Sequence, residues 1–362
     1  SGTGKTFLTR LLLIGMLPMP VAVNLVFDMP NEYGWEGTSE ADRKVKALKQ
    51  LFPAQVSVFT LDEQSSRRRG VSTDFVVKIG YDEIEPEDIA MLRETLTITE
   101  RGVDAVHELA ELYGKGWLEK YLAQPDRETQ EALKPRIDIP IGVLRALHFS
   151  LNQLKRMDFL SPQGGQDAVG HILKYLSDRK NVVLEFGKYN NNTAAYVLVA
   201  NLLTRRLHEE YVRRKEQAMG DSAQEPPPLV ITIEEAHRFL NPQVAPQTIF
   251  GTIAREMRKY NVSLLVIDQR PSGIDEEVMS QLGTKIACLL DNERDIDSVL
   301  TGVPGKTELR VVLARLESKQ QALIFGHALP MPVVVRTREY GSAESYREFG
   351  FGEASQLKRQ AE

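Results

Sequence analysis

Short apolar runs separated by polar turns recur along the chain, and they constrain its fold more than any other feature. They are rich in Val, Ile, Leu and Phe, which is typical of strands buried on both faces of a sheet. Helical periodicity lies between several of them, and this alternation predicts an α/β fold with a doubly wound, mostly parallel sheet. The runs cover residues 21–27, 55–59, 181–186, 229–233, 262–267, 285–290, 321–325 and 333–335.

The size and charge of the chain narrow the classes of protein further. Its 362 residues can bury one large core with an inserted subdomain, or two modest domains. The formal net charge of −5 argues against a protein that coats nucleic acid with its whole surface, so any such contact must be local. The single cysteine, Cys288, cannot form an internal disulfide, and we expect a reducing, cytoplasmic setting.

An apolar stretch at residues 11–27 could be mistaken for a membrane span. Gly15, Pro18, Pro20 and Asn24 interrupt it, and Asp28 ends it. A membrane helix needs about 20 predominantly apolar residues, so a buried helix followed by a buried strand explains the pattern better. We therefore expect no membrane contact.

The pattern changes to helical periodicity with polar breaks over residues 86–180. This change predicts a helical insertion in the α/β core. The core would then consist of residues 1–85 and 181–340, and the polar residues 341–362 would form a C-terminal tail. Residues 193–215 are predicted to form one long amphipathic helix, whose basic last turn suits the negative end of the helix dipole.

The first six residues match the second half of a Walker A loop, G-x-x-x-x-G-K-[ST]: Ser1, Gly2, Thr3, Gly4, Lys5 and Thr6. In such a loop backbone N–H groups surround the phosphates, and the following helix presents its positive end to them. We expect Lys5 to reach the β- and γ-phosphates of ATP and Thr6 to bind Mg²⁺ through its hydroxyl. A glycine-rich turn without nucleotide is the alternative if the half-motif stands alone. The rest of the motif would precede residue 1, so we expect the chain to be a fragment.

A buried strand at residues 229–233 ends in two carboxylates, Glu234 and Glu235. ATP hydrolysis needs one acid to hold the hydrated Mg²⁺ and a second group to orient the attacking water. We assign Glu234 to the metal and Glu235 to the water; a pair that caps the next helix is the alternative. His237 is expected to pack or hydrogen-bond rather than bind a metal, because no Cys/His cluster accompanies it.

A charged helix at residues 253–260 leads into the strand 262–267, which is followed by Asp268 and Gln269. Gln269 is expected to sense the γ-phosphate through a hydrogen bond, or else only to satisfy loop backbone groups. Arg255 or Arg258 is predicted to act as an arginine finger on the ATP of a neighbouring subunit. Taken singly, either arginine is more often a solvated helix residue.

The half Walker A loop, the acidic strand, the arginine helix and the strand before Gln269 follow one another in this order along the chain. In this arrangement the motifs resemble those of the HerA family within the HerA/FtsK superfamily of motor ATPases. The segments that carry the resemblance are SGTGKT (1–6), FDMPNEYG (27–34), ITIEEAHRFL (231–240), IAREMRKYNVSLLVIDQRPSGID (253–275), SQLGTKIACLL (280–290) and IFGHALPMPVVVR (324–336). The resemblance implies a RecA-like P-loop NTPase core, a homo-hexameric ring, ATP-driven movement along double-stranded DNA and, often, a partner nuclease of the NurA kind. Residues 86–180 carry no matching motif.

The resemblance also implies roles for single residues. The nucleotide-site residues would be Lys5, Thr6, Glu234, Glu235 and Gln269, and the finger candidates Arg255 and Arg258. Glu32 stands where the family has an acidic residue after its second strand, and would help to order the site. Glu234 replaces the commoner aspartate, and Asp268 replaces a small hydroxyl residue, so the metal geometry stays open.

Two basic segments could contact DNA phosphates. One is a predicted loop at residues 65–70 with Arg67, Arg68 and Arg69, and the other follows a strand and contains Lys188. A ring motor needs few cations in each subunit, because its copies multiply them. A solvated surface is the alternative for each segment. No recognised DNA-reading module is present, so we expect no base-specific recognition.

These features favour an ATP-hydrolysing ring motor that translocates on double-stranded DNA, acting with a nuclease in DNA end processing, repair or defence. The alternatives are a ring ATPase of the conjugation or secretion type, and a nucleotide-dependent scaffold for an effector nuclease. Glu235 and Gln269 disfavour the scaffold, because these groups would act only on water and the γ-phosphate.

Overall fold

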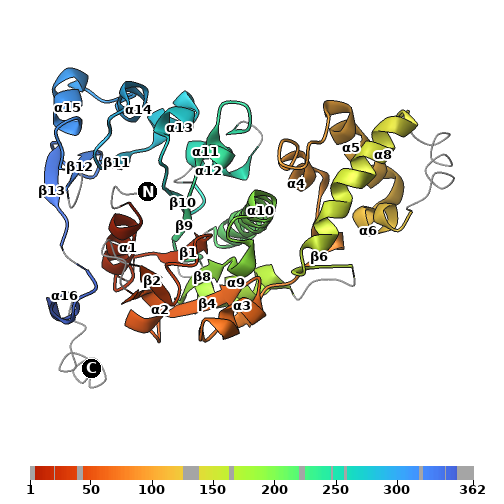
Figure 1. Ribbon diagram of the computed structural model, residues 1–362, viewed down its shortest axis with the longest axis horizontal. Helices are drawn as coiled ribbons and strands as arrows, with labels where there is room; N and C mark the ends of the chain where they lie inside the picture. The colour runs from red at the N-terminus through yellow and green to blue at the C-terminus, as the bar shows by residue number, and fades with distance from the viewer. Residues whose placement is uncertain are drawn as a thin grey trace.

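The computed structural model describes residues 5–19, 21–38, 44–124, 138–162, 167–219, 225–245, 248–256, 259–317, 321–338 and 340–348. Its centre is a six-stranded parallel sheet in the order β10-β9-β1-β8-β4-β5 (Figure 1). The strands are β1 (Val23–Asp28), β4 (Val56–Thr60), β5 (Phe75–Val76), β8 (Asn181–Glu185), β9 (Leu229–Ile233) and β10 (Val262–Val266). Every residue of β1, β4 and β8 is buried. The α/β fold with a mostly parallel sheet is thus confirmed.

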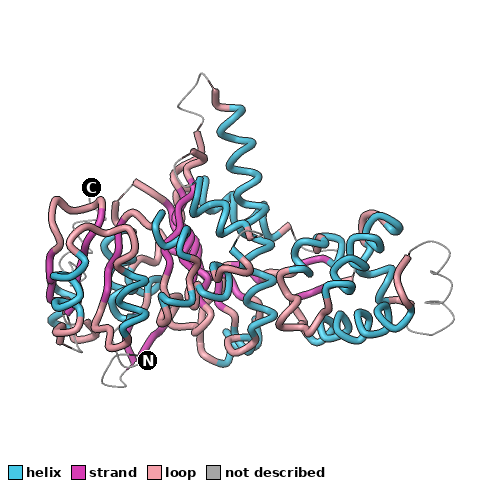
Figure 2. Tube along the Cα trace, turned by 90° about the horizontal axis from the view of Figure 1, so that it is seen from above, coloured by secondary structure: helices cyan, strands magenta, loops and turns pink. Residues whose placement is uncertain are grey.

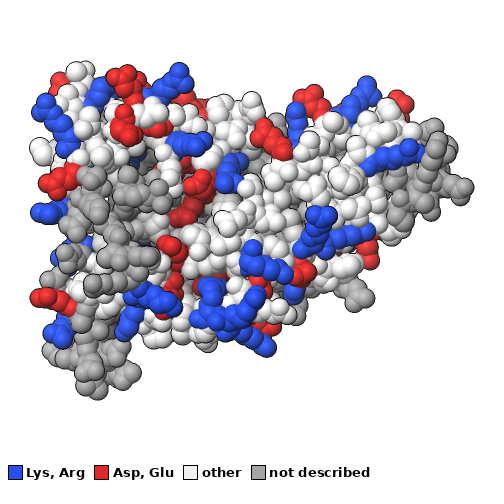
Figure 3. Space-filling view, in the orientation of Figure 1, with Lys and Arg blue, Asp and Glu red and all other residues white. Residues whose placement is uncertain are grey.

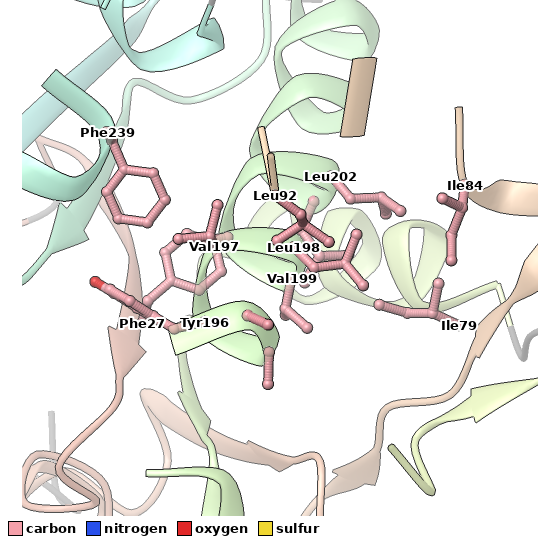
Figure 4. Close-up of a cluster of buried hydrophobic side chains, with 14 of the residues drawn as sticks. Phe27, Ile79, Ile84, Leu92, Tyr196, Val197, Leu198, Val199, Leu202 and Phe239 are labelled. Carbon is pink, nitrogen blue, oxygen red and sulfur yellow. The ribbon is translucent and has the colours of Figure 1, made fainter. Parts of the chain in front are cut away.

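Successive residues of β1 enter two different cores. Val23, Leu25 and Phe27 belong to a large cluster with α10 (Thr193–Gln217) and α12 (Ile249–Glu256), whereas Val26 packs with α1 (Lys5–Met16) and α2 (Leu48–Leu51). Because neighbouring strand residues point to opposite faces, the sheet is covered on both sides. Figure 4 shows Phe27 close to side chains of α10 in the first of these cores.

Helix α10 is the longest described helix, with 25 residues. The Asn192 side chain caps it by accepting the N–H of Ala195 at 3.0 Å, and Arg214 and Lys215 stand in its last turn. The N-terminal half of the helix is buried, and its C-terminal half extends beyond the sheet in Figure 2. The predicted long helix is therefore present.

A group of helices lies to one side of the sheet, on the right in Figures 1 and 2. It consists of α4 (Pro86–Ala90), α5 (Glu100–Tyr113), α6 (Trp117–Leu122) and α8 (Ile141–Leu151), with the 3₁₀ turns η1 (Tyr81–Glu83) and η2 (Asn152–Arg156). A short parallel pair, β6 (Ile79–Gly80) and β7 (Leu160–Ser161), joins the two ends of this group. Helix α9 (Ala168–Ser177) contacts β8 and α10, so this last helix of the segment 86–180 packs with the sheet.

The C-terminal part forms a separate antiparallel sheet of β11 (Thr284–Ala287), β12 (Gln321–Gly326) and β13 (Val333–Arg336). Helices α14 (Glu293–Val299) and α15 (Lys306–Leu313) pack on it around a third core. The remaining elements are β2 (Glu36–Thr38), β3 (Lys44–Lys46), α3 (Glu63–Arg68), η3 (Gly187–Tyr189), α11 (His237–Leu240), η6 (Pro271–Gly273), α13 (Glu276–Gln281) and α16 (Ala343–Glu348). Within the described part of the chain, no helix has the length and apolarity that crossing a membrane requires.

Candidate functional site

Acidic residues gather at one edge of the parallel sheet. Strands β1 and β8 end in Asp28 and Glu185, which are paired in register, and Glu234 directly follows β9. In open parallel sheets the carboxyl ends of the strands form the edge at which ligands bind. This edge is therefore the candidate site.

Two buried tyrosines hold Glu234. The hydroxyl of Tyr33 donates to Glu234 Oε1, and the hydroxyl of Tyr196 accepts the N–H of Glu234 at 3.0 Å and donates to its carbonyl at 2.8 Å. Burial and the Glu234 carboxylate raise the pKa of both phenols. Both hydroxyls consequently keep their protons and remain donors, and they fix the main chain and one carboxylate oxygen of Glu234.

The hydroxyl of Tyr33 also connects α1 to this acid. The side chain of Thr9 lies close enough to this hydroxyl to act on the pKa of Tyr33, which it tends to lower, and Thr9 lies on α1 one turn after the start of the helix at Lys5 and Thr6. Thr9 and Tyr33 are both buried. The first turns of the helix that follows the half Walker A loop therefore lie beside the acid that follows β9.

Glu235 has a left-handed backbone, with φ at +51°. This conformation is uncommon for residues other than glycine and costs about 1 kcal/mol. Its side chain is 32% exposed, and its Oε2 lies 3.8 Å from Nε2 of His237. The two consecutive acids thus differ in surroundings, because tyrosine hydroxyls hold Glu234 whereas Glu235 reaches solvent.

Asp268 links the loop after β9 to the loop after β10. It accepts the N–H of His237 at 2.6 Å, Nδ1 of the same residue at 2.9 Å, and the N–H of Arg270 at 2.6 Å. The hydrogen bond to Asp268 raises the pKa of His237. Burial acts to raise the pKa of Asp268, but its hydrogen bonds outweigh burial and lower it. The hydrogen-bonding role expected of His237 is confirmed, and Asp268 has a role that its place in the sequence did not indicate.

Asp28 organises the turn after β1. Its carboxylate accepts the N–H groups of Glu32, Tyr33 and Gly34 at 2.8–2.9 Å, and burial together with Glu185 raises its pKa. Nη2 of the buried Arg10 lies 3.1 Å from the carbonyl of Glu32 and 3.7 Å from its carboxylate. Glu32 therefore belongs to the turn that carries Tyr33, and it faces α1.

Arg69 pairs with a buried acid although its own side chain is 33% exposed, unlike the other cations proposed for DNA. Its Nη2 lies 2.5 Å from Oε2 of the fully buried Glu185, so we correct its assignment as a free DNA contact. The predicted loop at residues 65–70 is also wrong, because Glu63–Arg68 form helix α3, capped by Asp62.

The remaining three cations of this set lie at the surface. Arg67 pairs with Glu63 at 2.6 Å, and Lys188 contacts Asp158. Lys and Arg side chains gather over α3 in Figure 3. These exposed pairs are weak in water, so their cations can exchange partners.

The other predicted residues are either exposed or outside the described part of the chain. Arg255 is exposed on α12, and Gln269 is exposed just after β10. Ser1, Gly2, Thr3, Gly4, the Lys5 side chain and Arg258 lie outside the described residues. Within the described residues, no cluster of three or more His, Cys, Asp or Glu side chains could bind a metal ion.

Residues 1–207 match the family described as "Helicase HerA, central domain". A segment of 117 residues is 40% identical to the DNA double-strand break repair helicase HerA of Pyrococcus furiosus, and covers 30% of this chain and 20% of that protein. A segment of 167 residues is 29% identical to the protein of the same name from Sulfolobus acidocaldarius, and covers 43% of this chain and 33% of that protein. The matches thus span a fifth to a third of these relatives.

Solved structures with the same fold include VirB4 of Thermoanaerobacter pseudethanolicus, with a TM-score of 0.54 and 15% identity over 93% of this chain and 87% of that one. The bacterial conjugative coupling protein TrwBΔN70 has a TM-score of 0.57 and 10% identity over 95% of this chain and 85% of that one. These likenesses establish a RecA-like P-loop ATPase fold. Since the family match covers residues 1–207 of 362, the chain belongs to the HerA helicase family.

Proposed function

We propose that this chain is the ATPase body of a ring motor that hydrolyses ATP and moves along double-stranded DNA. The bridge from Thr9 through Tyr33 to Glu234 supports the proposal. It links the helix that begins at the lysine of the half Walker A loop to the acid after β9. In P-loop NTPases, metal and phosphates are bound between these two elements.

The side chains at this edge fit ATP and Mg²⁺. Mg²⁺ prefers oxygen ligands and keeps several waters, and the Thr6 hydroxyl and the Glu234 carboxylate are oxygen groups that would bind it directly or through water. When bound, ATP–Mg²⁺ supplies the phosphoryl group that is transferred. Lys5 would contact the phosphates, Glu235 would orient the attacking water, and Gln269 would hydrogen-bond the γ-phosphate.

The proposal includes a ring, because an arginine finger acts on the nucleotide of a neighbouring subunit. Arg255 is exposed on α12, and we propose it as the finger, with Arg258 as the second candidate. A guanidinium supplied in this way stabilises the charge of the transition state and raises turnover by about 10³-fold or more in other NTPases. We propose six subunits, after the hexameric form that the family resemblance implies.

Double-stranded DNA is the polymer along which we propose that the motor moves. The relatives are named as DNA double-strand break repair helicases, which favours a role in DNA end processing, repair or defence with a NurA-type nuclease or a defence effector. VirB4 and TrwB share the fold at 10–15% identity, and this likeness is limited to the fold. Because only the fold is shared, a motor of the conjugation or secretion type is the second candidate and not the first.

The test is ATP turnover by the full-length protein with and without linear duplex DNA. Lys5→Ala and Glu235→Gln should each lower DNA-stimulated turnover by about 10²-fold or more. The matched controls are Lys174→Ala and Glu111→Gln, which change exposed residues on α9 and α5 and should retain turnover. Unchanged turnover in both site variants would refute the assignments, and stimulation by single strands alone would favour the second candidate.

A further inference from the structure

Tyr33 is a fully buried residue whose hydroxyl lies between two elements of the proposed ATP site. Its exposed fraction is 0%, and its N–H donates to Asp28 Oδ2 at 2.8 Å. The turn after β1 therefore fixes the position of the ring. At the far end of the ring, the hydroxyl meets Glu234 from the loop after β9 and Thr9 from α1.

The single proton of the phenol gives this bridge a direction. A tyrosine hydroxyl has one proton to donate and two acceptor positions. Its proton is directed to Glu234 Oε1, so the phenol oxygen has only acceptor positions left on the side of Thr9.

Tyr196 restrains a different part of Glu234. Its hydroxyl bonds to the N–H and the carbonyl of Glu234 and leaves the rotation of the side chain unrestricted. A glutamate has one more rotatable bond than the aspartate that is commoner at this position in the family. The bond from Tyr33, in contrast, restricts the carboxylate itself.

We propose that Tyr33 is a positioning residue that sets the rotamer of the Glu234 carboxylate relative to α1, and thereby sets the affinity of the ATP site for Mg²⁺. This inference rests on the proposed function. Groups that orient a metal-binding side chain typically change metal affinity by about 10–100-fold when they are removed. Loss of the Tyr33 hydroxyl should therefore affect metal binding more than nucleotide binding.

The test uses Tyr33→Phe in the full-length protein, which keeps the ring and removes the hydroxyl. A fluorescent ATP analogue is titrated first in EDTA and then with MgCl₂. We expect nucleotide affinity in EDTA to stay within about 2-fold, and the Mg²⁺ midpoint to rise by about 10-fold or more. ATP turnover should recover at high MgCl₂, which a general loss of structure would not allow.

Tyr121→Phe is the matched control. Tyr121 is also fully buried, and its hydroxyl donates to the carbonyl of Leu144 at 2.6 Å in the helical group. This variant loses a buried hydrogen bond of the same kind, and its Mg²⁺ midpoint should not change. If Tyr33→Phe does not fold, Thr9→Val removes the hydroxyl beside Tyr33 and should shift the midpoint in the same direction.

A double-mutant cycle separates the inference from the proposed function. In a Glu234→Ala background, Tyr33→Phe should produce no further change in the Mg²⁺ midpoint, because the two residues act through one hydrogen bond that both variants remove. Equal midpoints for wild type and Tyr33→Phe, or a shift that persists in the Glu234→Ala background, would overturn the inference. A wild-type protein that binds no ATP analogue at any MgCl₂ concentration would overturn the proposed function itself.

Discussion

Asp268 accepts two hydrogen bonds from His237, one from its N–H at 2.6 Å and one from its imidazole Nδ1 at 2.9 Å. His237 begins α11 two residues after Glu235, and Asp268 directly precedes Gln269 in the loop after β10. The pair therefore ties together the loops proposed to contact the attacking water and the γ-phosphate.

This pair should make stability depend on pH. The pKa of His237 is raised above 6.5, so its contribution is complete below 6.5 and is lost as pH rises through the raised value. The pKa of Asp268 is lowered below 3.8, so its contribution is present above 3.8 and is lost as pH falls through the lowered value. Asp268→Asn should thus cost about 1.5–3 kcal/mol of unfolding free energy near pH 5, and less at alkaline pH. Denaturant unfolding at several pH values measures this, and a difference that is constant with pH would contradict the assignment.

Arg69 and Arg67 are two residues apart but should differ in their effect on stability. Arg69→Ala would leave the fully buried Glu185 without its cation and should cost about 3 kcal/mol. Arg67 has a side chain 76% exposed in its pair with Glu63, so Arg67→Ala should stay within about 0.5 kcal/mol. Thermal unfolding of the two variants measures the contrast, and equal losses would show that the Glu185 pair does not form.

The exposed cations should govern the salt dependence of DNA binding if α3 and η3 face the duplex. Removal of the charges of Arg67, Arg68 and Lys188 should reduce the slope of log affinity against log salt by about 0.9 for each DNA phosphate that the variant no longer neutralises. The matched control removes the charges of three exposed cations elsewhere, Arg101, Lys115 and Lys174. An equal reduction in both triple variants would support the solvated-surface interpretation.

The left-handed backbone of Glu235 should lower the free energy of unfolding, although the side chain is expected to serve ATP turnover. Because its φ is +51°, Glu235→Gly should relieve the left-handed strain and raise the unfolding free energy by up to about 1 kcal/mol, while turnover falls. Glu235→Ala keeps the Cβ atom and should lower turnover without this gain. Thermal unfolding compares the two, and an equal gain in both would assign the effect to the absent carboxylate instead.

Much of the fold could be predicted from the sequence because buried parallel strands are near-continuous apolar runs. The run Leu229–Ile233 coincides with β9, and the run at residues 181–186 contains β8. The sequence did not predict helix α3 because its residues are all polar, and two arginines at its end are followed by a third at the C-cap. A signal was nevertheless available, since Asp62 stands at the N-cap and accepts the N–H of Ser65.

The candidate site could be predicted only in part. The acids after β9 are adjacent in the sequence and follow an apolar strand, so Glu234 and Glu235 could be singled out. Tyr33 lies 201 residues before Glu234, and spacing along the chain cannot identify a contact made by folding. Tyr196 is similar, because in the sequence it resembles any apolar residue on the buried face of a helix.

The central claim is that the start of α1 and the acid after β9 bind one triphosphate together. A crystal structure of the full-length protein with Mg²⁺ and a non-hydrolysable ATP analogue tests it most directly. We predict Mg²⁺ at about 2.1 Å from the Thr6 hydroxyl, with Glu234 within hydrogen-bond distance of a metal-bound water and still in contact with Tyr33. A nucleotide bound at another edge of the sheet, with Glu234 remote from its metal, would contradict the account.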